Sequence, residues 1–180
     1  MLKHGILGLL NYHDMTGYAI KEVFDNSLNF FWTAQTSQIY RELQGLRKNG
    51  MVTMTMIEQE GKPDKKVCSI TEKGRKELMT WLSQGGLTVE SRSPLLMKVF
   101  FLGERSPQEN IECFRKFRSS CEEFLKSLES VEETIDLFEN IIQNREKSAY
   151  WQMTLNLGRK NMRMYIEWAD ECIARMEEMI

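Results

Sequence analysis

The stretch TSQIYRELQGLRKNGMV, Thr36 to Val52, predicts a short helix that ends at a glycine and continues into a strand. Its apolar residues Ile39, Leu43 and Leu46 recur at the spacing of one helical face, so this face should pack on a core. The opposite face carries only uncharged polar and basic side chains, listed in chain order as Ser37, Arg41, Gln44 and Lys48. An acid-free helical face of this kind needs a partner to contact.

The charge of the chain is unevenly divided. The 180 residues, 42% of them hydrophobic, carry a formal net charge of −2, and this length suits one or two domains with a proper core. Residues 1–85 hold 11 Lys and Arg against 9 Asp and Glu, whereas residues 86–180 hold 13 against 17. The first part can therefore approach an anionic partner, and the second part would avoid one.

Short elements surround the opening stretch. Helices are expected over residues 2–12 and 17–26, and two alternating runs, 51–59 and 66–71, are expected as strands joined by the turn EGKPDK. Gly50 should end the third helix as a left-handed cap, and Thr71 should cap a fourth helix. The order helix, helix, helix, strand, strand, helix is typical of a winged helix-turn-helix, which makes the fold mainly α with a small β-hairpin.

The segment SQGGLTVESRSP, residues 83–94, has paired glycines, a proline and no sustained period, and it predicts a joint between a domain at 1–85 and one at 94–180. Everything beyond it is helical, with Ser106 and Pro107 opening a long helix and a second long helix expected over residues 148–179. A helix of ~35 residues is about 50 Å long, so a second copy of the chain is its natural cover. The apolar spacing resembles a coiled-coil seam, and the residues expected to hold two chains together are Phe114, Phe117, Phe124, Leu128 and Val131.

Catalysis, metal binding and membrane insertion have no support in the sequence. There is no phosphate-binding glycine loop, nucleophile elbow or zinc-protease motif. The four cysteines are scattered and only two histidines accompany them, which indicates buried thiols in a reducing cytosol and no metal or other cofactor. No apolar run approaches the ~20 residues of a membrane span, and the N-terminal run is too short for a signal peptide. We therefore expect a cytoplasmic protein that is not an enzyme.

In a winged helix the third helix recognises DNA and the hairpin reaches the phosphate backbone. The first residues of that helix would face base edges, where Gln38 can pair with adenine, and Arg41 could contact a base or a phosphate. The residues predicted to contact DNA are Thr36, Ser37, Gln38, Tyr40, Arg41, Lys62, Lys65 and Lys66. Plain alternatives remain at this stage, since Tyr40 could belong to the core and the lysines could serve solubility. Gly45 could permit close packing on another helix or a close approach to DNA.

The same residues resemble the PadR family of bacterial transcriptional regulators over residues 2–82. The residues that carry the resemblance are Ser37, Ile39, Tyr40, Leu43, Leu46, Gly50, Gly61, Pro63, Thr71 and Gly74, together with ILGLL and TGYAI in the first two helices and Trp32 before the third. PLLMKVFFLGERSPQE and the segment from Trp151 onward are similar to the helical dimerisation domain of the longer branch of that family. Cys68 departs from the tyrosine usual there, which implies altered packing of the wing strand.

The resemblance implies a homodimeric repressor that binds double-stranded DNA at a palindromic operator and is released by a small apolar or aromatic effector. Trp151, Met153 and Trp168 could line a cavity for such a compound, although aromatics and methionines at helical spacing are more often core. The alternative function is a winged helix used as a protein–protein interaction module, with the long helices as a scaffold. Salt-dependent binding to duplex DNA would distinguish the two functions.

Overall fold

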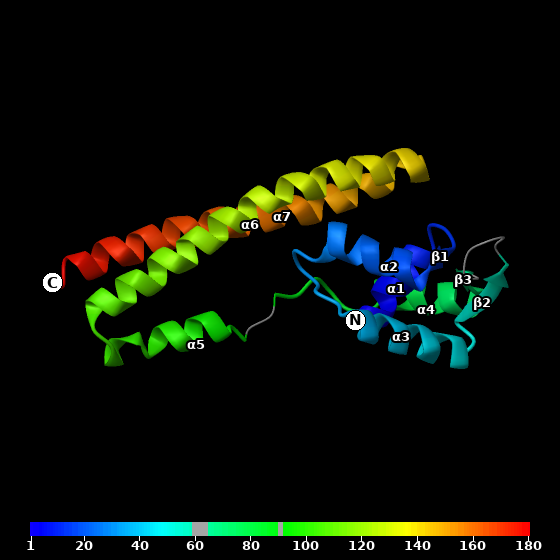
Figure 1. Ribbon diagram of the computed structural model, residues 1–180, viewed down its shortest axis with the longest axis horizontal. Coiled ribbons are helices and arrows are strands. Elements are labelled where there is room, and N and C mark those ends of the chain that lie inside the picture. The colour runs from blue at the N-terminus through cyan, green and yellow to red at the C-terminus, as the bar shows by residue number, and fades with distance from the viewer. Residues whose placement is uncertain (59–64, 90–91) are drawn as a thin grey trace. The chain divides into compact units, whose positions relative to one another are not determined.

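The computed structural model describes residues 1–58, 65–89 and 92–180, and it divides into two compact units, Met1–Gly86 and Leu87–Ile180. Each unit is described by itself. Figure 1 shows that the first unit is a cluster of short helices with a small sheet, whereas the second consists of long helices. Among the described residues, no helix combines the length and hydrophobicity needed to cross a bilayer.

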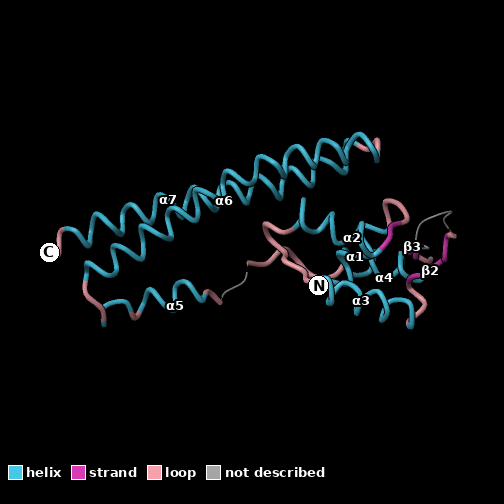
Figure 2. The backbone as a smooth tube through the Cα atoms, viewed as in Figure 1, coloured by secondary structure: helices cyan, strands magenta, loops and turns pink. Residues whose placement is uncertain are grey.

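The first unit has the element order that the sequence predicts, with one addition. Its elements are α1 Leu2–Leu10, β1 Met15–Thr16, α2 Gly17–Val23, the π-helical turn η1 Phe24–Leu28, α3 Thr36–Lys48, β2 Val52–Ile57, β3 Lys65–Ile70 and α4 Glu72–Ser83. The winged helix-turn-helix fold is confirmed. The two-residue strand β1 was not predicted, and it pairs antiparallel with β3 to complete a sheet of order β1-β3-β2 (Figure 2).

The second helix differs from its predicted span. Thr16 caps it, because its hydroxyl accepts the backbone N–H of Ala19 at 3.1 Å. The α-helical part ends at Val23, and the chain continues as a π-helical turn to Leu28 instead of ending at residue 26. The hydroxyl of Ser27 donates to the Val23 carbonyl at 2.6 Å, which satisfies a backbone acceptor inside this turn.

The core of the first unit is built from one face of each helix and the inner face of the sheet. Its fully buried side chains are Ile6, Leu7, Leu10, Ile20, Ile39, Leu43, Val52 and Cys68. Cys68 lies on the central strand β3, opposite Met15 of β1 and Met54 of β2. A small thiol is therefore paired in register with a methionine on each neighbouring strand.

The end of α3 has the left-handed glycine cap that the sequence predicts. Gly50 has a φ of 68°, its N–H donates to the Arg47 carbonyl at 3.0 Å, and the next N–H, of Met51, donates to the Leu46 carbonyl at 2.9 Å. These two bonds are the Schellman pattern, which satisfies the last carbonyls of a helix and turns the chain sharply. This turn sends the chain from α3 directly into β2.

The second unit consists of α5 Pro94–Phe100, a 3₁₀ turn Leu102–Glu104, α6 Pro107–Ile142 and α7 Arg145–Glu177. Ser106 caps α6 with Pro107 at its first position, as predicted, and the side chain of Glu109 accepts the Ser106 N–H to complete a capping box. The last helix starts three residues before its predicted position, because Asn144 accepts the Lys147 N–H and acts as its cap.

The two long helices α6 and α7 lie side by side and antiparallel (Figures 1 and 2). Ion pairs join them at intervals along their length: Arg115 with Glu177 at 3.1 Å, Arg118 with Asp170 at 2.6 Å, and Arg159 with Glu132 at 2.6 Å. Apolar side chains are buried between them, including Leu128, Ile135, Leu155 and Ala169. Much of the apolar face of α6 is therefore covered by α7 of the same chain.

Candidate nucleic-acid interface

The helix α3 has two faces of opposite character. Ile39, Leu43 and Leu46 are at most 3% exposed, which confirms the predicted apolar stripe. Ser37, Arg41, Gln44 and Lys48 are all exposed on the other side. Within the described residues, the side chains of Arg41 and Lys48 form no hydrogen bond or ion pair, so both are available to bind an anionic partner. This face can donate hydrogen bonds and neutralise phosphates.

A side chain of α3 forms a hydrogen bond with the backbone at the start of the same helix. Thr36 and Ser37 are exposed, and Gln38 is half-buried. The backbone N–H of Gln35, the cap residue, donates to the Oε1 of Gln38 at 2.9 Å. Glutamine at the third helical position thus closes one half of a capping box, which the sequence reasoning missed because glutamine is not among the common N-cap residues.

Tyr40 lies between two helices. It is 45% exposed, so it is not a core residue. A Cβ on Gly17, the first residue of α2, would stand 2.8 Å from the Tyr40 ring and 3.2 Å from its hydroxyl oxygen. The ring therefore packs against the start of α2, where only glycine leaves room.

Gly45 stands in open space. Outside the backbone of its own helix, no heavy atom of the described residues lies within 4 Å of the position that a Cβ would take. Packing of α3 on a neighbouring helix of this unit therefore does not require a glycine there. The close approach of a partner at Gly45 stays a prediction.

The wing residues lie at the free end of the hairpin. Lys65 and Lys66 are exposed at the start of β3, where they pair in register with Ile57 and Met56 of β2. Lys62, together with Gly61 and Pro63 of the wing motif, lies outside the described residues. Among the predicted wing contacts, the structure thus places two lysines on the hairpin that follows α3.

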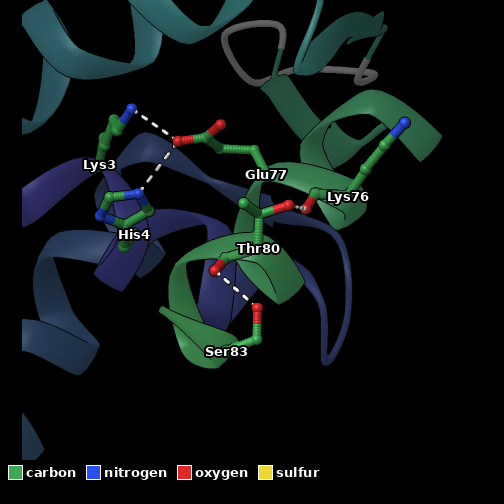
Figure 3. A network of polar contacts seen from close by, with 6 residues as sticks. All are labelled: Lys3, His4, Lys76, Glu77, Thr80 and Ser83. Carbon is green, nitrogen blue, oxygen red and sulfur yellow. Dashed lines mark hydrogen bonds and ion pairs between the residues drawn. The ribbon is translucent and has the colours of Figure 1, made fainter. Parts of the chain in front are cut away.

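A cluster of α1 and α4 side chains braces the unit that presents α3. Figure 3 shows Lys3 and His4 converging on Glu77, with Lys3 Nζ at 2.8 Å and His4 Nε2 at 3.1 Å from the same carboxylate oxygen. The His4 ring also stacks on Trp81, with centroids 4.5 Å apart. Because a carboxylate accepts, Nε2 carries the hydrogen, and Nδ1 is buried without a hydrogen-bond partner in the described structure.

This environment shifts the pKa values of two groups. Burial lowers the pKa of His4, and the hydrogen bond that His4 donates to Glu77 only partly offsets that effect. The hydrogen bond from Lys3 lowers the pKa of Glu77, with a further contribution from His4. His4 therefore serves as a neutral donor that ties α1 to α4, a role that the sequence did not indicate, because histidines were considered there only as metal ligands.

The residues predicted to form the dimerisation seam occupy two kinds of position on α6. Leu128 is fully buried and Phe114 is 6% exposed within the protomer, where Phe114 packs with Leu102 and Ala169. Phe117, Phe124 and Val131 are half-buried. Leu128 and Phe114 are therefore buried within the protomer. Contact of the half-buried residues Phe117, Phe124 and Val131 with a second chain stays a prediction.

All four cysteines are free thiols, with Cys68 and Cys121 buried and Cys113 and Cys172 half-buried. Burial raises the pKa of the Cys68, Cys121 and Cys172 thiols, which disfavours the reactive thiolate. No group of three or more metal-ligating side chains gathers within the described ranges.

Comparison with known proteins matches each unit to a family. Residues 6–80 match the Transcriptional regulator PadR-like family, and residues 91–177 match the family described as Virulence activator alpha C-term. The first unit therefore carries the domain of the PadR-like family of transcriptional regulators. The helical second unit fits the longer branch of that family.

Its relatives include proteins of known structure. The Negative transcriptional regulator PadR of Bacillus subtilis (strain 168) is 26% identical over 99% of this chain and 98% of that protein. The crystal structure of Bacillus subtilis PadR in complex with operator DNA matches with a TM-score of 0.81 and 28% identity, covering 97% of this chain and 98% of the other. The same protein in complex with p-coumaric acid matches with a TM-score of 0.74 and 26% identity, covering 98% and 95%.

Proposed function

We propose that this PadR-like regulator binds a palindromic operator as a homodimer, with α3 of each protomer in the major groove. The observation that carries the proposal is the exposed, acid-free face of α3 beside the lysines of the β2–β3 hairpin. The similarity of the fold to PadR bound to operator DNA supports the same use of these elements. A regulator that acts on an operator works where the chromosome is, which places this protein in the cytoplasm as part of the proposal.

The contacts divide into those that read sequence and those that hold the backbone. Thr36, Ser37 and Gln38 stand at the start of α3, the part of a recognition helix that meets base edges. Arg41 lies one turn further along and would contact a phosphate. Lys65 and Lys66 would add contacts to the backbone from the hairpin, which position the protein without reading sequence. The open space at Gly45 would allow the DNA backbone to approach the helix closely.

A homodimer supplies two half-site contacts, which a palindromic operator requires. The second unit carries the exposed apolar side chains that a second copy would cover. On α5 and just after it these are Leu96, Met97, Phe100 and Phe101, and near the turn between α6 and α7 they are Leu137, Ile141, Tyr150, Met153 and Leu157. Isolated apolar side chains are common on surfaces, but groups on neighbouring turns of this kind mark an interface. The name of the Bacillus subtilis relative supports negative regulation.

The effector would be a small planar aromatic acid, the class to which p-coumaric acid belongs. A half-open hollow of about 360 Å³ lies between α5 and α7, lined by Ser93, Leu95, Leu96, Met164, Tyr165 and Trp168. Its size and apolar lining suit a single aromatic ring. Trp151 and Trp168 are about 25 Å apart along α7 at 1.5 Å per residue, so one small cavity within a protomer cannot contain both.

Binding of duplex DNA tests the proposal directly. The full chain is incubated with a pool of random duplexes, the preferred duplex is selected, and its affinity is measured at two salt concentrations. We expect the logarithm of the affinity to fall steeply with the logarithm of the salt concentration, and Arg41→Ala to reduce that slope by about one. Arg175→Ala, the same charge change on exposed α7, is the matched control and should leave the slope unchanged.

Two outcomes would count against this function. If the wild-type chain shows no salt-dependent affinity for any duplex, α3 does not lie in a groove, and the protein–protein interaction module becomes the better account. If both arginine variants lower the slope equally, binding is a diffuse effect of net charge rather than a contact of α3.

A further inference from the structure

Gln44 lies within the exposed face of α3, beyond the first turn of the helix. The buried apolar stripe defines the side of α3 that meets the core. The exposed residues that point away from that side are Ser37, Arg41, Gln44 and Lys48. At ~100° per residue, all four side chains leave the helix within about 50° of the direction opposite the stripe. A partner that lies along this face therefore meets Gln44 between the two cations Arg41 and Lys48.

The amide of Gln44 is free at both ends. Within the described residues its side chain forms no hydrogen bond or ion pair, so Oε1 can accept and the two hydrogens of Nε2 can be donated. The next residue, Gly45, brings no side chain, and the space that its Cβ would occupy is open. A partner can therefore approach the helix at this turn without displacing a side chain.

The spacing along α3 includes Gln44 in the set of side chains that a groove would meet. The recognition helix of a homeodomain contacts DNA with residues at i, i+3, i+4 and i+7. Counted from Ser37, these positions are Ser37, Tyr40, Arg41 and Gln44. The single acid of α3, Glu42, is half-buried and points about 110° away from the centre of the exposed face, so its charge lies to one side of the contact.

An amide with both ends free is complementary to adenine. In the major groove adenine presents an acceptor at N7 and a donor at N6, and glutamine pairs with both, because Nε2 donates to N7 and Oε1 accepts from N6. Guanine presents acceptors at N7 and O6 and offers the glutamine oxygen no donor. We propose that Gln44 reads an adenine in each half-site of the operator. This inference rests on the proposed function and adds a specificity-determining residue beyond the first turn of α3.

Gln44 should contact a different base pair from the first turn of the helix. Ser37 and Gln44 are ~10 Å apart along α3 at 1.5 Å per residue, which is about the rise of three base pairs. A bidentate contact discriminates against a wrong base by about tenfold. Because glutamine is uncharged, removing it releases no counterion and should leave the salt dependence of binding unchanged.

The experiment compares the wild-type chain with Gln44→Ala on the selected duplex, on each of its single-base-pair variants, and on duplexes in which single adenines are replaced by 7-deazaadenine. That replacement removes the N7 acceptor from the major groove. The matched control is Gln84→Ala, the same substitution at an exposed glutamine just after α4. All titrations are done at two salt concentrations, and thermal unfolding of the three proteins shows whether each is folded.

For the wild-type chain we expect one position in each half-site where A·T is favoured over G·C by about tenfold and where 7-deazaadenine weakens binding about fivefold. Gln44→Ala should lose both effects at that position, keep the preferences at the other positions, and keep the salt slope of the wild type. Gln84→Ala should match the wild type on every duplex.

The inference is overturned if Gln44→Ala keeps every base preference of the wild type, or if the position that responds to it prefers G·C. It is also overturned if 7-deazaadenine at that position weakens the wild type and Gln44→Ala equally, or if Gln84→Ala changes the preferences in the same way. A wild-type chain that binds no duplex in a salt-dependent manner refutes the proposed function instead, so the two failures are distinct.

Discussion

Alanine should have opposite effects at two glycines of the DNA-binding unit. At Gly74, in the first turn of α4, a Cβ would stand 2.3 Å from the carbonyl oxygen of Met51 and 2.8 Å from Cγ1 of Ile70. The nearest atom belongs to the backbone, so the joint between α3 and α4 must shift to relieve the contact. Overpacking of this kind costs about 1–3 kcal/mol, and the better helix propensity of alanine returns only ~0.5–1 kcal/mol. Gly74→Ala should lower the free energy of unfolding by about 1–2 kcal/mol.

At Gly45 the same substitution meets open space. Only the propensity effect remains there, so Gly45→Ala should raise the free energy of unfolding by about 0.5–1 kcal/mol. If α3 lies in a groove as proposed, the added methyl group should nonetheless weaken binding to the selected duplex. Gly45→Ala would then be a more stable protein with lower DNA affinity, a combination that a general folding defect cannot produce.

Urea denaturation followed by far-UV circular dichroism measures both variants against the wild type. The protein concentration is kept the same in all samples, because the apparent stability of a dimer depends on it. The reasoning is refuted if Gly74→Ala is at least as stable as the wild type, or if Gly45→Ala is less stable. Unchanged affinity of Gly45→Ala for the selected duplex would refute the close approach of DNA at this position.

Three further outcomes are expected. Replacing Lys65 or Lys66 by alanine should weaken binding to all duplexes about equally and lower the salt slope by roughly one unit per lost phosphate contact, measured by titration at two salt concentrations. Because burial lowers the folded-state pKa of His4, its contribution to stability is present above the unfolded pKa of ~6.5 and is lost as the pH falls below it; His4→Gln should remove this part of the pH dependence of urea unfolding. Light scattering should show that a charge at half-buried Phe124 gives folded monomers, whereas a charge at fully buried Leu128 should unfold the α6–α7 pair. If Phe124→Glu remains a dimer, Phe124 is not part of the interface.

Features that depend only on neighbours a few residues away follow from the sequence. The apolar stripe of α3, its glycine cap at Gly50 and the Ser106–Pro107 start of α6 are all predicted and are all present. Each of them is a helical period or a capping pattern whose donors and acceptors lie within one or two turns. The family resemblance rests on the same local motifs, which is why the sequence suffices to predict the winged helix and its recognition helix.

Contacts between distant segments decided the rest. Strand β1 has only two residues, too few to show a period, and it exists because Met15 and Thr16 find Cys68 and Val67 on β3. A hydrophobic period does not reveal whether an apolar helical face will pack on a helix of the same chain or of another chain, because the hydrophobic effect is non-directional.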